Sequence, residues 1–415
     1  MSVRNTFPQQ RPTLNLDFAN SKTLDPRITF TRTSTATYVD EDGLIKSVDA
    51  DVARFDHDPE TGECLGLLVE ESRSNLVTYS SDMSQWSANV SPIYADNDTT
   101  APDGTLTADK LTGNNAAADG RFIIVTISAN TTYSVASFIK PTDQPRTRIG
   151  VYSNVDSWYG NVDTDWDANG EPTTQNSVGA SNIKYEPYPN GWYRVSFQFT
   201  SPATINGNVN YFHMPDRTIS GKSAWFWGAQ LEAGAFSTSY IPRPDTSTAT
   251  RNPDNVSMTG DNFSDWYNPS EGTFYSQFKG ESRAGSTGYV TKIVYSISDG
   301  SFNNSHYGVT PESNGDMYWY SVSSGAGQGL LGITPLQPFA SNVVYKSAYA
   351  IKTNDRALSI NGYIDTDSTT TLPVVNRLYI GSSWTGSSIY LGGHISKLTY
   401  YPTRLTNAQL QTLTK

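Results

Sequence analysis

The chain has 415 residues, of which 36% are hydrophobic and 12% aromatic, and its formal net charge is −11. This length predicts two or three domains. An acidic chain without a Lys/Arg cluster is a poor ligand for phosphates, so we expect no nucleic-acid partner. A single cysteine, Cys64, excludes an intrachain disulfide framework. No apolar run reaches membrane-spanning length, so we expect no membrane insertion.

Residues 1–79 are predicted to form an N-terminal arm with short strands, which is too extended to own a hydrophobic core. Segments 15–18 and 28–31 alternate apolar and polar residues as strands do. Short segments of this kind need a partner to bury their apolar surface. We therefore expect the following side chains to pack against another domain or subunit as assembly or anchoring residues: Leu14, Leu16, Phe18, Ile28, Phe30 and Leu44.

Residues 80–243 are predicted to form an antiparallel β-sandwich with a jelly-roll-like arrangement. Strand candidates recur between turn signals, and several show the period-two alternation of half-buried strands. Asn190-Gly191 before Trp192 is a hairpin signal.

Residues 244–415 are predicted to form a second antiparallel β-sandwich, and the domain break is expected between Tyr240 and Asn255. Asn361-Gly362 is a favoured type I′ hairpin turn. Residues 406–413 are the one predicted helix, with Thr406 as its N-cap. The fold class is therefore all-β, with two sandwiches after the N-terminal arm.

The sequence carries no recognisable catalytic constellation. Its four histidines are widely separated, and no Gly-x-Ser-x-Gly elbow or phosphate loop occurs. The Glu-x-Asp-x-x-Glu string that a sandwich-fold glycosidase uses for its paired carboxylates is absent from the C-terminal block. We therefore expect no enzymatic activity, and a glycan-degrading depolymerase is the alternative.

One loop partly matches a calcium site. Asp165, Asp167 and Asn169 fit the opening of the D-x-[DN]-x-[DN]-G pattern, but the closing position falls on Asn176 instead of Glu. A polar hairpin tip explains the same residues. We expect no cofactor and keep calcium as an open alternative.

Aromatic residues are the best candidates for ligand contacts, because flat rings stack on the apolar faces of sugars. Adjacent residues of a strand point to opposite faces, so one aromatic of each adjacent pair is expected in the core and the other outside. The carbohydrate-binding candidates are Trp158, Tyr159, Trp166, Trp319, Tyr320 and Trp384.

Several strings resemble structural proteins of tailed bacteriophages. Residues 30–45 (FTRTSTATYVDEDGLI) and 53–77 resemble the N-terminal region of such proteins. Residues 101–105, 191–195 and 227–234 resemble the carbohydrate-binding-module-like domain of phage head spikes and fibres. Residues 361–362, 378–381 and 395–402 with the following helix resemble a concanavalin A-like (laminin-G-like) sandwich.

This resemblance implies a fibre, spike or decoration subunit of the virion, synthesised in the host cytoplasm. It also implies binding to other virion proteins and assembly as a homo-oligomer, most simply a trimer. Contact with a host-surface glycan through a sandwich domain is the further expectation.

Overall fold

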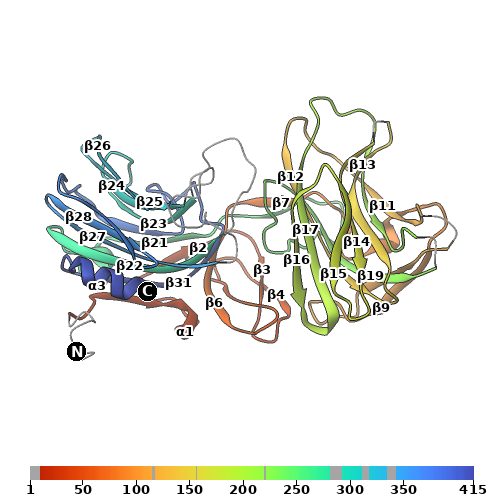
Figure 1. The fold of residues 1–415 in the computed structure, drawn as a ribbon, viewed down its shortest axis with the longest axis horizontal. Helices are drawn as coiled ribbons and strands as arrows, with labels where there is room; N and C mark the ends of the chain where they lie inside the picture. Colours follow the sequence, from red (N-terminus) through yellow and green to blue (C-terminus); the bar gives the residue numbers. More distant parts are fainter. Residues whose placement is uncertain are drawn as a thin grey trace.

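The computed structural model describes residues 10–114, 117–155, 157–218, 221–280, 292–310, 317–333 and 343–415. The expectation of an all-β fold is confirmed, because 52% of the chain is strand and 6% is helix. Figure 1 shows two lobes side by side, with the N-terminal strands β3, β4 and β6 lying between them.

The first lobe is a β-sandwich of two six-stranded antiparallel sheets, ordered β16-β17-β12-β19-β10-β9 and β15-β14-β13-β18-β11-β8. The strands are β8 (Ser87–Asn89), β9 (Ile93–Thr99), β10 (Ala108–Thr112), β11 (Gly120–Val125), β12 (Thr132–Pro141), β13 (Arg146–Ser153), β14 (Trp158–Trp166), β15 (Pro172–Val178), β16 (Ser181–Tyr188), β17 (Trp192–Thr200), β18 (Val209–Met214) and β19 (Ser223–Ala233).

The core of this lobe forms from alternate residues of facing strands. Val135 and Phe197 from one sheet meet Val151 and Val162 from the other, and all four are buried. Because side chains alternate along a strand, this arrangement sends the intervening residues to the outer faces of the sheets.

The second lobe is a sandwich of an eight-stranded and a seven-stranded sheet. The first has the order β29-β28-β27-β22-β31-β6-β5, with β1 added on β31, and the second has the order β2-β21-β30-β23-β24-β25-β26. The strands are β1 (Leu14–Asp17), β2 (Thr29–Thr31), β5 (Phe55–His57), β6 (Cys64–Val69), β21 (Asn255–Thr259), β22 (Glu271–Gly280), β23 (Lys292–Ser298), β24 (Ser305–Thr310), β25 (Met317–Ser323), β26 (Ala326–Ile333), β27 (Val344–Lys352), β28 (Asp355–Ile360), β29 (Tyr363–Asp367), β30 (Arg377–Ile380) and β31 (Gly393–Tyr401).

Two short ladders and two short helices complete the connections. β3 (Ala36–Val39) pairs with β4 (Ile45–Val48), and β7 (Arg73–Asn75) pairs with β20 (Ala249–Arg251). The helices α1 (Phe18–Ser21) and α2 (Asp261–Ser264) are single turns.

The N-terminal residues 10–79 are built into the two lobes. Leu14, Leu16 and Phe18 are buried in the core of the second lobe, and Ile28 and Phe30 pack partly buried against it. Leu44 is half-buried and has Cδ1 beside Gly104 of the first lobe. The predicted arm therefore buries its apolar side chains within the chain, where strand pairing with β31 and β21 fixes them.

Two local predictions are confirmed. Asn361 and Gly362 have φ values of 46° and 87° between paired residues Ile360 and Tyr363, as a type I′ turn requires. Helix α3 (Asn407–Thr414) begins with a capping box in which Thr406 and Gln409 satisfy each other's main chain. The helix covers the outer face of the eight-stranded sheet.

Candidate functional site

A platform of four rings lies on the outer face of the sheet β15-β14-β13-β18-β11-β8. We call it the aromatic face, and its rings are Phe122, Tyr152, Trp158 and Phe212. Phe122 is the cross-strand partner of Phe212, and their rings stack with centroids 5.1 Å apart. Tyr152 pairs with Trp158, again at 5.1 Å. Cross-strand pairing therefore gathers rings that are distant in sequence.

The aromatic face is partly open to solvent. Phe122, Tyr152 and Trp158 are half-buried, while Phe212 beneath them is 5% exposed. Ile124, two residues from Phe122 on the same strand, is 57% exposed. Half-buried rings with fixed neighbours offer rigid apolar surface to a ligand at little cost in side-chain entropy.

Two amide side chains belong to residues that are cross-strand neighbours of this part of the sheet. Gly150 of β13 has Asn161 as its cross-strand partner on one side and Phe212 on the other. Asn210 is the cross-strand partner of Tyr152. Asn161 is fully buried, and in the described part of the chain neither its Oδ1 nor its Nδ2 has a hydrogen-bond partner. The Nδ2 of Asn210 donates to Oδ1 of Asn154 at 2.6 Å, while its own Oδ1 has no partner among the same residues. Unpaired buried amides are exceptions in folded proteins and point to a bound water or ligand group.

Two ion pairs border the rings. Arg148 and Asp163 form a buried two-point pair, with Nη2 2.6 Å from Oδ2. Arg146 and Asp165 form a second, more exposed pair, with Nε 2.6 Å and Nη2 2.8 Å from the carboxylate oxygens. The guanidinium carbon of Arg148 lies 4.8 Å from the ring centre of Trp158, so this pair also fixes the indole.

The structure separates the candidates of the first lobe. Trp158 belongs to the aromatic face, whereas Tyr159 is half-buried and packs against the sandwich core. The expectation that Trp166 contacts a ligand is wrong for this conformation, because it is 3% exposed and donates its indole N–H to Thr147. Phe122, Tyr152 and Phe212 were not predicted as ligand contacts, because their only sequence signal is their alternation with core residues.

The candidates of the second lobe divide in the same way. Trp319 is fully buried and donates to the hydroxyl of Tyr295, so its proposed ligand contact is also wrong. Tyr320 and Trp384 lie in a half-buried cluster with Tyr307 and Phe302. Phe302 is 40% exposed, which makes this cluster a second, smaller aromatic surface.

The loop that partly matches a calcium site is the hairpin tip between β14 and β15, as the alternative interpretation expected. Both carboxylate oxygens of Asp165 accept from Arg146, and Asp167 Oδ1 accepts from the main-chain N–H groups of Asn169 and Glu171. These hydrogen bonds explain the loop as a turn. Within the described residues, carboxylates close enough to share a cation occur elsewhere, at Asp82, Asp96 and Asp109.

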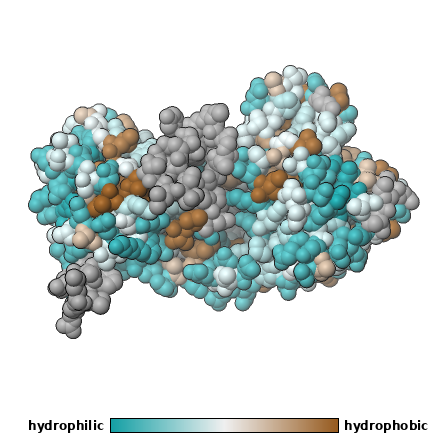
Figure 2. All heavy atoms as spheres, in the orientation of Figure 1, coloured by the Kyte–Doolittle hydropathy of each residue, from teal (hydrophilic) through white to brown (hydrophobic). Residues whose placement is uncertain are grey.

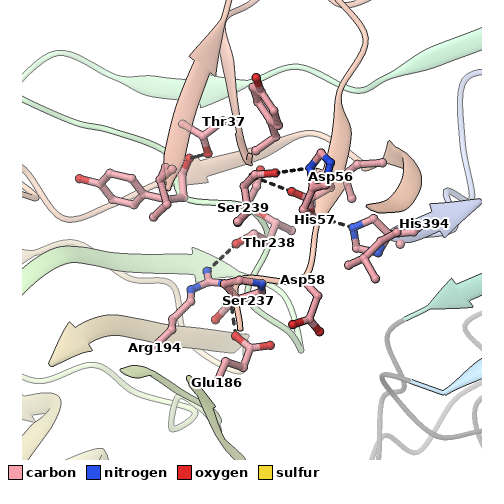
Figure 3. A pocket seen from close by; sticks show the side chains of 18 of the residues that line it. Thr37, Asp56, His57, Asp58, Glu186, Arg194, Ser237, Thr238, Ser239 and His394 are labelled. Atoms are coloured by element: carbon pink, nitrogen blue, oxygen red, sulfur yellow. Dashed lines mark hydrogen bonds and ion pairs between the residues drawn. The ribbon is translucent and has the colours of Figure 1, made fainter. Parts of the chain in front are cut away.

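A pocket of about 420 Å³ lies where the two lobes and the N-terminal strands meet (Figure 3). Phe138, Ile45 and Tyr240 contribute apolar side chains to its lining. Figure 3 shows Arg194 and Glu186 pointing toward one another on one side, across from Asp56 and His394.

Asp56, His394 and Arg194, three polar residues of this pocket, have bonded partners. Asp56 accepts from the main-chain N–H of Val39 and lies 2.7 Å from Nε2 of His394. Arg194 Nη2 donates to the carbonyl of Thr238 at 2.5 Å, and its Nη1 lies 3.8 Å from Glu186. The pair of Asp56 with His394 joins β5 to β31 within the second lobe, and the bonds of Arg194 lie within the first lobe, so these contacts hold each wall of the pocket in place.

The face of the molecule drawn in Figure 2 carries mostly polar side chains. Figure 2 shows a mostly hydrophilic side on which apolar residues form small separate patches. Among the described residues, no helix has the length and apolar character needed to cross a membrane.

No protein-family model matches the chain. A curated relative, the tRNA3(Ser)-specific nuclease WapA of Bacillus spizizenii, is 33% identical over 137 residues. This match takes in 33% of the chain and spans only 5% of the nuclease's length, so it assigns no family.

Similar solved structures are β-sandwich domains. The CBM40 domain of the Ruminococcus gnavus IT-sialidase bound to α2,3-sialyllactose is 16% identical, with a TM-score of 0.29 over 36% of this chain and 84% of that chain. Domain 4 of the arabinanase AbnA from Geobacillus stearothermophilus, in complex with arabinotriose, is 14% identical, with a TM-score of 0.30 over 44% of this chain and 84% of that chain. TM-scores at this level assign no ligand to the chain.

Proposed function

We propose that the chain is a non-enzymatic structural protein of a tailed-bacteriophage particle that adheres to host-surface glycans through the aromatic face. The observation that carries the glycan contact is the half-open platform of Phe122, Tyr152 and Trp158 on the same sheet face as the unpaired amide of Asn161. Stacking rings and nearby amides are the groups that recognise the apolar faces and hydroxyls of sugars.

The place in a particle rests on the sequence resemblance. Residues 30–45 and 53–77 are similar to phage structural proteins, and fibre or spike subunits of that kind assemble as homotrimers with other virion proteins. Many copies on one particle raise avidity, so weak single sites are sufficient for adhesion. Light scattering of the purified chain tests the trimer, and cryo-electron microscopy of the particle tests its location.

A glycan-degrading depolymerase is the second candidate. The observation in its favour is the pocket between the lobes, where the carboxylates of Asp56 and Glu186 are both part of the lining. Hydrolysis requires one free acid and one base or nucleophile. The hydrogen bonds of Asp56 to Val39 and His394 favour a structural role for that carboxylate.

A two-part experiment separates the candidates. Purified protein is applied to a glycan array, and any polysaccharide that it binds is then incubated with it and assayed for new reducing ends. Binding without reducing ends supports the proposal. Reducing ends that disappear in Asp56→Asn or Glu186→Gln would establish the depolymerase, and the absence of any glycan binding would overturn the adhesion role.

A further inference from the structure

Among the residues that the structure describes, one cation beside the aromatic face forms no ion pair with a carboxylate. Three arginines, Arg146, Arg148 and Arg217, lie at this end of the sheet, but Asp163 and Asp165 are each taken up by one arginine at two points. Two neutral pairs therefore form, and the guanidinium of Arg217 remains.

The contacts of Arg217 within the described residues are weak. Its main-chain N–H donates to the carbonyl of Arg146 at 2.8 Å, while its Nη1 lies 3.6 Å from Sδ of Met214, a poor acceptor. Its Nε is buried without a hydrogen-bond partner. Leaving such a donor unpaired is costly, and an anionic ligand would remove that cost.

The acidic groups around Arg217 are occupied. Asp216 is fully buried, and its carboxylate accepts from the main-chain N–H and hydroxyl of Thr218 and from the N–H of Lys222. The ammonium of Lys222 donates to the carbonyl of Gln144 at 2.8 Å.

Arg217 is connected to the rings through two neighbouring residues, Met214 and Arg148. Its contact Met214 is the cross-strand partner of Arg148, whose guanidinium carbon is 4.8 Å from the ring centre of Trp158. A sugar ring stacked on Trp158 therefore has a cation beside one edge. A guanidinium matches a carboxylate with two parallel hydrogen bonds.

We propose that the aromatic face selects acidic glycans and that Arg217 recognises their carboxylate group. This inference rests on the proposed glycan adhesion and adds the class of sugar. The rings alone would accept neutral and acidic sugars alike, whereas the unpaired cation favours the charged ones.

The test is an array that carries polygalacturonate, alginate, hyaluronate and polysialate, each beside its carboxyl-reduced form, with dextran and dextran sulfate as further arms. We expect the full chain to bind at least one acidic polymer about tenfold more tightly than its reduced form, as one charge-assisted contact provides. Added salt should shrink this difference through screening.

Variants locate the effect. Arg217→Gln should abolish the preference for the acidic polymer and keep binding to its reduced form. Arg217→Lys should restore part of the preference. The control is Arg377→Gln, at a half-buried arginine of the second lobe, and it should leave both affinities unchanged. A preference that survives Arg217→Gln, equal binding of both forms, or binding of dextran sulfate alone would overturn the carboxylate assignment. Binding of no sugar at all would overturn the adhesion role itself.

Discussion

Arg54 donates from Nη2 to Oδ2 of Asp254 at 2.5 Å, and both side chains are completely buried although 200 positions separate them. Glu70 lies 2.7 Å from Arg54 and 2.8 Å from Arg251, and it accepts from the main-chain N–H of Ser239. This network joins the N-terminal residues to both lobes. The neighbouring arginines hold the pKa of Glu70 well below its ordinary value in spite of burial.

Glu70→Gln should destabilise the protein strongly. The substitution leaves Arg54 and Arg251 buried without their shared counter-charge, which typically costs about 3–5 kcal/mol of unfolding free energy. Asp25→Asn is the matched control, because Asp25 forms a partly exposed pair with Arg27 and should cost less than about 1 kcal/mol. Denaturant unfolding compares the two, and equal losses would show that the buried network is not a major contributor.

A fragment that begins at Asn252 should not fold. It lacks β1, β5 and β6, which pair with β31 or with each other, and it lacks the buried side chains of Leu16 and Phe18. Exposed edge strands and an opened core favour aggregation. Near-ultraviolet circular dichroism and thermal unfolding provide the check, and a native-like spectrum with a cooperative transition would contradict the shared core.

Stability should fall as the pH drops from 7 to 5. Burial lowers the pKa of His213 and of His306 to about 3 in the folded state, with Arg356 adding to the effect at His306. The ordinary value is 6.5, so each histidine contributes stability that is fully present above pH 6.5 and is lost as the unfolded chain binds protons. The loss by pH 5 is about 2 kcal/mol for each residue.

His306→Leu isolates one of these contributions. The variant removes the titrating ring of His306 from the second lobe. In the part of the chain that the structure describes, neither nitrogen of that ring has a hydrogen-bond partner. Its unfolding free energy should change about 2 kcal/mol less between pH 7 and pH 5 than that of the wild type. An unchanged pH dependence would mean that His306 becomes protonated in the folded state.

The C-terminal helix should depend on its cap. Thr406→Ala removes the acceptor for the main-chain N–H of Gln409, and a lost N-cap costs about 1 kcal/mol. Thr412→Ala should not destabilise, because the hydroxyl of Thr412 bonds back to the carbonyl of Ala408 within the helix. Thermal unfolding of the two variants measures the difference.

Local features could be predicted from sequence where one residue type decides the conformation. Asn361-Gly362 specifies its turn because both residues tolerate positive φ, and Thr406 starts its helix by capping it. Strand pairing could not be predicted, since nothing local in Leu16 identifies Leu398 as its partner.

The same limit explains the errors in the candidate site. Trp158 and Trp166 both read as exposed aromatics near turns, and only the strand register sends one outward and the other into the core. Phe122 and Phe212 are ninety positions apart in sequence, so their stacking follows from the pairing of β11 with β18. The rings of a sheet face become a site only through such cross-strand contacts.

The most direct test of the central claim is the affinity of single-site variants for a glycan that the wild type binds. We expect Trp158→Ala to weaken binding by about tenfold, the loss expected for a stacked ring, and Trp384→Ala in the second lobe to stay within about twofold of the wild type. Full affinity in Trp158→Ala together with loss in Trp384→Ala would contradict it and place the glycan on the second lobe.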